Sequence, residues 1–330
     1  MNYKELDEEG QIRQVEKIVP SILDQYGIES VSTINVNHSF NSSFKVTDKN
    51  GETYALRINL GSGKSEPEVL AEMQWLEQLS LDPLISAPKP RRTTNQELLT
   101  TTFFEPLDTN FTAVLFDWIE GEEVGDEPTN EQLFEMGQSM ARLQIFAKDL
   151  AFTEPAFLPT INRTLLNSKD NLTLNQPEQI NDGLYADILK ALDLAEKTFS
   201  RISDNQQLIP IHADLHMGNV IQTSTGLAII DFDDAGIGLP IQDLAISNYY
   251  IREDKEREKH LFAGFSSVLE LPKIAQEDYE VVLLSRLILL VNAVLEMTSA
   301  EIIEFLPTFL ERTQKRLDKF FETGEFVLQD

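Results

Sequence analysis

The sequence predicts an α+β fold made of two regions of different character. The first third of the chain contains five strand-like runs and one inserted helix, whereas nearly every periodic segment after it is helical. The change falls at an acidic loop over 120–130, so we expect an N-terminal lobe at 1–118 and a helical C-terminal lobe at 119–330. A chain of 330 residues can bury a large core in such an arrangement.

The strand-like runs of the first region cover 31–36, 43–46, 53–58, 97–104 and 113–118. The tetrapeptide DKNG at 48–51 is a turn signal between the second and third runs, which predicts an antiparallel sheet. A single helix is expected at 66–79, between the third and fourth runs. Before the sheet, apolar residues at helical spacing predict a helix over 9–26 that Pro20 breaks or kinks.

Helical periodicity dominates the second region, where the predicted helices cover 131–147, 178–202, 242–250, 254–269, 277–297 and 300–323. Residues 152–176 lack this periodicity and are rich in Asn, Thr and Pro, so we expect a loop-rich insertion there. The longest apolar stretch, 281–297, contains Arg286 and Asn292 and is shorter than a typical membrane span. It therefore predicts a buried helix.

The composition narrows the range of partners. Acidic residues exceed basic ones by 55 − 27 = 28, so a phosphate backbone would be repelled and no nucleic-acid partner is expected. The sequence has no cysteine, which excludes a disulfide framework, a thiolate nucleophile and a zinc-thiolate site. Its first fourteen residues have no apolar core and are not a signal peptide. We therefore expect a cytoplasmic protein with no membrane partner.

The chemistry-bearing side chains gather between residues 208 and 245. His212 is followed by Asp214, by Asn219 five residues later, and by Asp231 at the end of the apolar run 227–230. This is the spacing of a phosphoryl-transfer site, in which one carboxylate accepts the proton of the attacking hydroxyl. An amide oxygen and a second carboxylate then hold the Mg²⁺ that neutralises the phosphates. Asp214 is thus the candidate base, and Asn219 and Asp231 are the candidate metal ligands.

Three motifs in this order resemble those of the aminoglycoside phosphotransferase and choline kinase family, small-molecule kinases with a protein-kinase-like fold. They are HADLHMGN at 212–219, IDF at 230–232 and DLA at 243–245. The resemblance implies a two-lobed protein-kinase-like fold that uses Mg²⁺ and ATP, with GTP as the alternative nucleotide. It also implies transfer of the γ-phosphate to a hydroxyl of a small molecule. Residues that would support this site are His212, His216, Asp233 and Asp243.

In such a fold, a cation on the third strand contacts the phosphates and pairs with a glutamate of the inserted helix. Arg57 stands where the usual Lys would be, and Glu72 is its expected partner, with Glu68 as the competitor. Because Arg presents a bidentate fork instead of a point charge, the phosphate geometry is expected to differ from that of a lysine enzyme. A surface salt bridge is the alternative interpretation of the pair.

The resemblance also places two binding segments in the first lobe. Residues 37–44 would form the hairpin that covers the phosphates, through Ser39, Asn41, Ser42 and backbone N–H groups. This hairpin has no glycine, unlike the G-x-G-x-x-G loop of protein kinases. Residues 116–118, with Phe116 and Trp118, would form the hinge that meets the adenine through backbone groups.

Four alternatives remain beside the small-molecule kinase. His212, Asp214 and His216 have the H-x-D-x-H spacing of a metal-dependent hydrolase. The segment GSGKS at 61–65 resembles the end of a P-loop, but Ile58 occupies the position of the required first glycine. The missing glycine loop and Arg57 suit a non-catalytic pseudokinase. A protein Ser/Thr kinase is the fourth, although the segment 231–243 is too short for a regulatory activation loop.

The acidic residues around the motifs bear on the acceptor. Asp233, Asp234 and Asp243 lie close in sequence with few cations beside them. Such a pocket favours a neutral or cationic hydroxyl compound, namely an amino sugar, an amino alcohol or an amino acid such as homoserine. Asp243 has a second interpretation, in which its carboxylate bonds backbone N–H groups and holds the loop.

Overall fold

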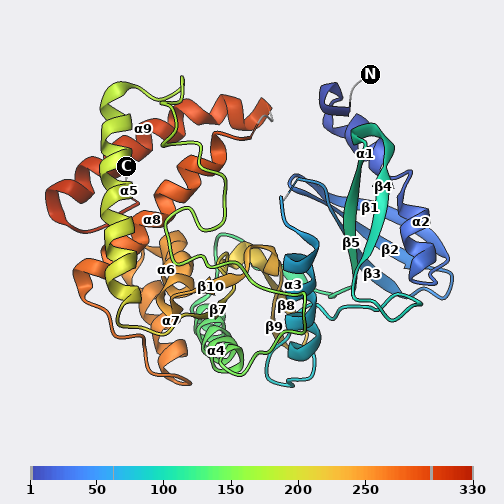
Figure 1. Cartoon of the computed structure of the whole chain (residues 1–330). Coiled ribbons are helices and arrows are strands. Elements are labelled where there is room, and N and C mark those ends of the chain that lie inside the picture. Colours follow the sequence, from blue (N-terminus) through green and yellow to red (C-terminus); the bar gives the residue numbers. More distant parts are fainter. Residues whose placement is uncertain (1–2, 62, 298–299, 329–330) are drawn as a thin grey trace. The chain divides into compact units, whose positions relative to one another are not determined.

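The computed structural model describes residues 3–61, 63–297 and 300–328 (Figure 1). The chain folds into two compact units and passes back into the first of them twice. Unit 1 consists of Met1–Glu122, Leu150–Leu158 and Thr223–Ile230, and unit 2 of Glu123–Asp149, Pro159–Gln222 and Asp231–Asp330. An antiparallel sheet lies in unit 1 and most helices lie in unit 2, so the α+β class is confirmed.

Unit 1 is built on a five-stranded sheet with the order β1-β2-β3-β5-β4, in which every neighbouring pair is antiparallel (Figure 1). Its strands are β1 (Ser30–His38), β2 (Asn41–Asp48), β3 (Thr53–Asn59), β4 (Thr100–Phe104) and β5 (Thr109–Asp117). The DKNG turn joins β2 to β3 as predicted. The Asp48 carboxylate accepts the N–H groups of Asn50 at 2.8 Å and Glu52 at 2.9 Å, and Gly51 supplies a φ of +86°.

The helices of unit 1 follow local sequence signals. The predicted helix over 9–26 is two helices, α1 (Glu8–Val15) and α2 (Val19–Gln25), and Pro20 lies in the first turn of α2, where its missing N–H costs nothing. The helix α3 (Glu66–Leu79) has the predicted bounds. Ser65 and Glu68 form a capping box at its start, so Glu68 satisfies the helix end.

The core of unit 1 lies between the sheet and the first two helices. Apolar side chains on one face of the strands, among them Phe44, Leu56 and Leu115, are fully buried against Val15 and Ile22 of α1 and α2. Removing such side chains from water is the main stabilising term, at about 1.5 to 3 kcal/mol for each large one. The opposite face of the same strands carries Arg57, and the core therefore fixes the strand from which this side chain projects.

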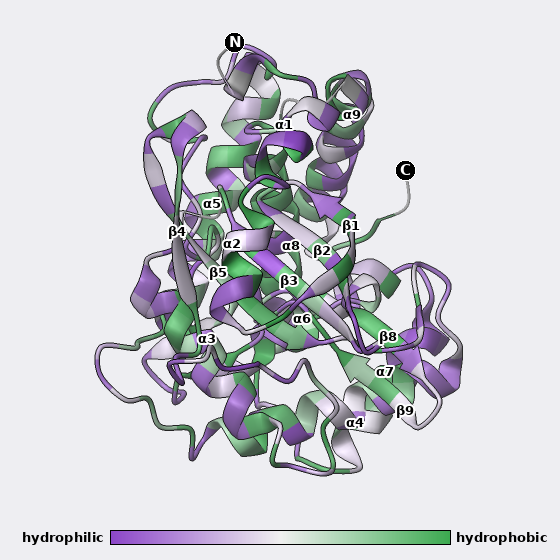
Figure 2. Cartoon of the chain, turned by 90° about the vertical axis from the view of Figure 1, so that its right-hand side faces the viewer, coloured by the Kyte–Doolittle hydropathy of each residue, from purple (hydrophilic) through white to green (hydrophobic). Residues whose placement is uncertain are grey.

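Unit 2 is mainly helical. Its helices are α4 (Asn130–Ala147), α5 (Asp182–Ser203), α6 (Pro240–Ile251), α7 (Lys255–Ser266), α8 (Gln276–Val294) and α9 (Ala300–Thr323). All six lie within a few residues of the predicted ranges. Hydrophobic residues, green in Figure 2, dominate α6, whereas α9 mixes green and purple. None of the described helices is long and apolar enough to cross a bilayer.

Five short strands follow the first sheet in the described part of the chain, and two of them, β7 and β9, match the apolar runs 208–211 and 227–230 that predict buried strands. They are β6 (Glu122–Glu123), β7 (Ile209–Ile211), β8 (Val220–Thr223), β9 (Gly226–Ile229) and β10 (Gly236–Gly238). Within unit 2, β7 pairs with β10 in antiparallel register. Ile209 and Ile211 of β7 are buried with Ile161 and with Leu289 of α8, which anchors the strand that leads into the candidate site. The predicted insertion at 152–176 contains no helix or strand.

Candidate active site

The loop that follows β7 carries the first motif and has an unusual backbone. Ala213 adopts a φ of +67°, a left-handed conformation that is unfavourable for a residue with a Cβ atom. Asp243 at the start of α6 holds this shape, because its carboxylate accepts the N–H groups of Ala213 at 2.8 Å and His212 at 3.2 Å. The interpretation of Asp243 as a residue that holds the loop is therefore supported. Burial raises the pKa of Asp243 to about 6, although these two backbone N–H groups favour its charged form.

Asp214 lies next in this loop, and its side chain is 21% exposed. Its Oδ1 accepts a hydrogen bond from Arg286 Nη2 at 2.5 Å. Its Oδ2 accepts one from Asn219 Nδ2 at 3.0 Å and lies 3.5 Å from His216 Nε2. Burial alone would raise the pKa of Asp214, but the His216 contact and the Arg286 charge outweigh it and hold this pKa at about 2. The candidate base is therefore ionised at neutral pH.

Asn219 ends the short 3₁₀ turn Met217–Asn219 and is almost fully buried. Its amide nitrogen donates both to the backbone oxygen of Asp214, at 2.9 Å, and to the Asp214 carboxylate. These two bonds fix the orientation of the amide group. The amide oxygen is thus the atom of Asn219 that can bind a hard cation such as Mg²⁺.

Asp231, the other candidate ligand, is exposed and is the second residue of the IDF motif. Its φ of +63° and ψ of +62° are left-handed, so the backbone turns sharply between β9 and the following 3₁₀ turn, Phe232–Asp234. Phe232 is buried, and its ring lies 4.6 Å from the buried ring of His212. This ring contact ties the second motif to the first within unit 2. Asp233 is half-buried in the same turn and Asp234 is exposed.

The histidines do not have the arrangement of the alternative hydrolase site. His212 Nδ1 accepts the N–H of Asp214 at 3.3 Å, and His216 Nδ1 accepts the N–H of Gly218 at 3.1 Å. These ring nitrogens therefore bind the loop backbone. Over residues 3–61, 63–297 and 300–328, no group of three or more His, Asp or Glu side chains is placed to hold a metal ion. The candidate Mg²⁺ ligands, one amide and one carboxylate, are a different donor set.

In unit 1 the expected ion pair is present. Arg57 of β3 donates to Glu72 of α3 through two bonds, Nη1 to Oε1 at 2.8 Å and Nη2 to Oε2 at 2.6 Å. Both side chains are less than 10% exposed, so this is not a surface salt bridge. Glu68, the competitor, caps α3 instead. The fork holds the guanidinium in one plane on the strand face that Arg57 shares with Ala55.

The predicted phosphate-covering hairpin is formed by β1 and β2. Ser39 lies at its exposed tip, and its N–H bonds the backbone oxygen of Asn41 at 2.9 Å. Asn41 is nearly buried. Ser42 departs from the prediction, because its hydroxyl is fully buried and hydrogen-bonded to His38 Nδ1 at 2.7 Å. We therefore assign the Ser42 side chain to the internal bonding of the hairpin and not to phosphate contact.

The predicted adenine hinge also needs correction. The N–H of Asp117 donates to Lys89 at 3.0 Å, and the N–H of Trp118 donates to Thr53 at 3.2 Å. Both of these N–H donors are therefore occupied by backbone oxygens within unit 1. Phe116 is buried and paired with β3, 5.9 Å from the Arg57 guanidinium carbon, and the Trp118 ring carries the Lys45 ammonium at 4.3 Å.

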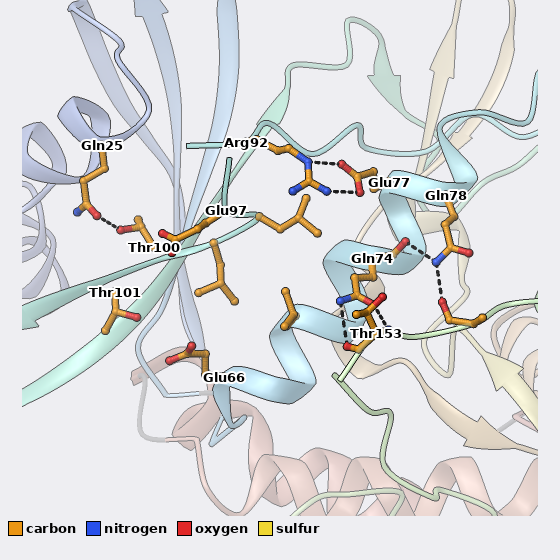
Figure 3. Close-up of a pocket in the computed structure, with 14 residues that line it drawn as sticks. Gln25, Glu66, Gln74, Glu77, Gln78, Arg92, Glu97, Thr100, Thr101 and Thr153 are labelled. Atoms are coloured by element: carbon orange, nitrogen blue, oxygen red, sulfur yellow. Dashed lines mark hydrogen bonds and ion pairs between the residues drawn. The ribbon is translucent and has the colours of Figure 1, made fainter. Parts of the chain in front are cut away.

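A cavity of about 830 Å³ lies elsewhere in unit 1, beside α3 (Figure 3). Residues at helical spacing on α3, among them Glu66, Gln74 and Glu77, face it, whereas Glu72 projects from the opposite side of the helix. Gln74 binds the backbone of Thr153 at its edge. None of the predicted site residues lines this cavity, so it is separate from the candidate chemistry.

Two side chains at the candidate base were missed from the sequence. Arg286 of α8 bonds Asp214 and also donates to the Tyr250 hydroxyl at 2.6 Å. The Tyr250 ring in turn lies 4.9 Å from the His216 ring. The sequence signal for Arg286 is that it is a charged residue inside the apolar run 281–297.

Comparison with known proteins identifies the family. The model of the phosphotransferase enzyme family, named APH, matches residues 31–271, which is more than half of the chain and includes all three motifs. The chain belongs to this family. The family resemblance that the three motifs indicate is therefore confirmed.

Individual relatives are distant. The amicoumacin kinase of Bacillus subtilis strain 168 is 26% identical over 212 residues, which are 62% of this chain and 58% of that protein, so the match spans less than two thirds of the relative. A microcompartment-associated aminopropanol kinase has the same fold, with a TM-score of 0.76 and 20% identity over 95% of this chain and all of that one. An amicoumacin kinase solved with AMP-PNP, Ca²⁺ and Ami follows, with a TM-score of 0.72 and 19% identity over 95% and 96% of the two chains. These structures confirm the fold of this phosphotransferase family member.

Proposed function

We propose that this protein is a kinase that transfers the γ-phosphate of ATP to a hydroxyl group of a small molecule, with Mg²⁺ as the metal and GTP as the second nucleotide to test. The observation that carries the proposal is Asp214. Its carboxylate is held by Arg286 and Asn219 and stays ionised at neutral pH. An oriented carboxylate of this kind is what proton acceptance from a hydroxyl requires.

The roles of the neighbouring groups follow from their atoms. The amide oxygen of Asn219 and the carboxylate of Asp231 are hard oxygen donors, which suit Mg²⁺. When bound, this ion would neutralise the phosphate charge that develops during transfer. The solved amicoumacin kinase contains a nucleotide analogue and a divalent ion, which supports nucleotide and divalent metal use by this fold.

Arg57 is the candidate phosphate contact in the N-terminal lobe, which we place at residues 1–118, with the acceptor and catalytic lobe at 119–330. Glu72 orients Arg57 through two bonds. An oriented cation of this kind stabilises transferring phosphate oxygens without having to reorganise. The presence of the Arg57–Glu72 ion pair also argues against the alternative of a non-catalytic nucleotide-binding protein.

For the acceptor, we propose an amino alcohol, an amino sugar or an amino acid. Asp233 and Asp234 follow the candidate metal ligand Asp231 in unit 2, and carboxylates there favour a neutral or cationic compound. Of the two solved structures compared above, the aminopropanol kinase has the higher TM-score. This likeness supports the amino alcohol class of acceptor. Asp243 takes no part in this argument, because it holds the loop backbone.

The proposal is tested by incubating the purified protein with Mg²⁺ and ATP or GTP against a panel of hydroxyl compounds. Nucleoside diphosphate release and a phosphorylated product, identified by mass spectrometry, should appear together for at least one acceptor. The matched control is Asp214→Asn, which has nearly the same shape but cannot accept the proton. Release of nucleoside diphosphate that is equal in the wild type and in Asp214→Asn, or absent from both, would contradict the proposed function.

A further inference from the structure

The helix α8 contains a charged side chain that its surroundings do not favour. Arg286 is 7% exposed and lies between buried apolar residues such as Leu284 and Leu287. Burying a guanidinium costs several kcal/mol unless good partners compensate for the lost water. A replacement by an apolar residue of similar volume would often be neutral or stabilising, so the packing of the helix gives no reason for an arginine here.

The partners of Arg286 all belong to the surroundings of the candidate base. Its Nη2 donates to Asp214 Oδ1 at 2.5 Å and to the Tyr250 hydroxyl at 2.6 Å, and its Nε lies 3.2 Å from the same hydroxyl. Tyr250 thus holds two nitrogens of the fork and fixes its plane. The guanidinium carbon lies 5.4 Å from the Tyr250 ring centre, so the ring also faces the charge.

The two oxygens of Asp214 consequently have different surroundings. Oδ1 is taken by Arg286, whereas Oδ2 lies beside Asn219 and His216, on the side of the candidate metal ligand. A carboxylate fixed through one oxygen presents the other in a defined direction. Of the two atoms, Oδ2 is then the one that would receive a proton.

We propose that Arg286 is a positioning residue for Asp214, which binds Oδ1 so that Oδ2 faces the acceptor hydroxyl. The inference rests on the proposed function and adds a residue that none of the three sequence motifs contains. Arg286 does not itself touch the acceptor or the nucleotide. Its effect on the reaction passes through the position of Asp214.

The experiment measures kcat and KM at one neutral pH for the wild type, Arg286→Gln and Arg286→Lys, with the acceptor that the panel identifies. Arg286→Gln should lower kcat by about tenfold or more and leave the nucleotide KM within about twofold, because it loses the fork that orients Asp214 but no group that touches the nucleotide. Arg286→Lys keeps a cationic donor, so kcat should recover, but only in part because the fork is lost.

Tyr250→Phe tests the same role from a second residue. It removes the hydroxyl that holds two nitrogens of Arg286 without changing the charge of Arg286, so kcat should fall while the nucleotide KM stays within about twofold. It also gives a test if Arg286→Gln does not fold. A kcat within about twofold of the wild type in Tyr250→Phe and in folded Arg286→Gln would overturn the proposal.

A second readout does not depend on activity. The ¹³C chemical shift of the Asp214 carboxyl carbon, assigned by its loss in Asp214→Asn and measured at one neutral pH, should change in Arg286→Gln and in Tyr250→Phe, because both alter the hydrogen bond to Oδ1. If the wild type transfers no phosphate, the proposed function fails, and this chemical shift still decides whether Arg286 holds the carboxylate. An unchanged chemical shift in both variants would overturn the inference even in an active enzyme.

Discussion

Asp243 at the start of α6 accepts the N–H of Ala213 at 2.8 Å, although Ala213 has a left-handed backbone. A non-glycine residue at φ +67° costs of order 1 kcal/mol or more, and such a conformation persists only where its surroundings over-determine it. The loop that presents Asp214 is therefore shaped by a buried carboxylate thirty residues further along the chain.

The Asp243 carboxyl gives the first prediction. Its pKa is raised from 3.8 to about 6 in the folded protein, so the fold favours its neutral form. The contribution of this shift to the unfolding free energy is on the order of 3 kcal/mol. It is fully present below about pH 4 and is lost as pH rises through about 6. The amide of Asp243→Asn cannot ionise. The unfolding free energy of this variant minus that of the wild type should therefore become more positive as pH rises from about 4 to about 7.

Urea unfolding of both proteins at several pH values measures this change. Asp193→Asn is the matched control, because Asp193 is an exposed carboxylate paired with Lys197 on α5. A constant difference between Asp243→Asn and the wild type over this range would show that Asp243 is ionised throughout.

Asp214→Asn should reduce turnover by about 10² or more and leave the affinity for Mg-ATP within a few-fold. The substitution removes the proton acceptor but retains a side chain of the same shape. Steady-state kinetics and nucleotide titration by calorimetry together separate the two effects. A parallel loss of nucleotide binding would mean that Asp214 belongs to the metal site.

Asp231→Ala should weaken Mg²⁺-dependent nucleotide binding, because it removes an anionic oxygen ligand. Nucleotide affinity is measured with Mg²⁺ and with EDTA, and the difference between the two conditions should shrink in the variant. Asp234→Ala, which changes an exposed carboxylate in the same turn, is the matched control. If the magnesium dependence of Asp231→Ala equals that of the wild type, Asp231 is not a ligand.

Arg57→Ala should raise the nucleotide KM, whereas Lys64→Ala should be nearly silent. Arg57 is held by Glu72 on the strand face opposite the core, and Lys64 lies in the connection between β3 and α3 without a complete glycine pattern. Glu72→Gln keeps Arg57 but weakens its two charge-assisted bonds, so it should give an intermediate KM. A binding defect found only in Lys64→Ala would support the P-loop interpretation instead.

The ranking of acceptors should follow charge. Protonated amino alcohols and amino sugars should have a higher kcat/KM than sugar acids of similar size, because Asp233 and Asp234 lie beside Asp231. Asp234→Asn should narrow the gap between the two classes. The electrostatic argument fails if an anionic acceptor ranks first and Asp234→Asn leaves the ranking unchanged.

The sequence alone determined the elements and the order of the motifs. Periodicity is a local property, so it predicted α3 and the five strands of unit 1, and the family resemblance proposed Glu72 as the partner of Arg57. The side chains of Asp214 and Asn219 were also predictable together, because only five residues separate them. The break between α1 and α2 was visible in Pro20.

The tertiary structure decided what depends on distant parts of the chain. Arg286 meets Asp214 across 72 residues, and no local pattern specifies which buried group an arginine in an apolar helix will bind. Strand register turned the Ser42 hydroxyl inward to His38, whereas the family resemblance had suggested that it contacts phosphate. The left-handed backbones of Ala213 and Asp231 also lack a sequence signal, because neither residue is glycine and only the surrounding packing makes these conformations favourable.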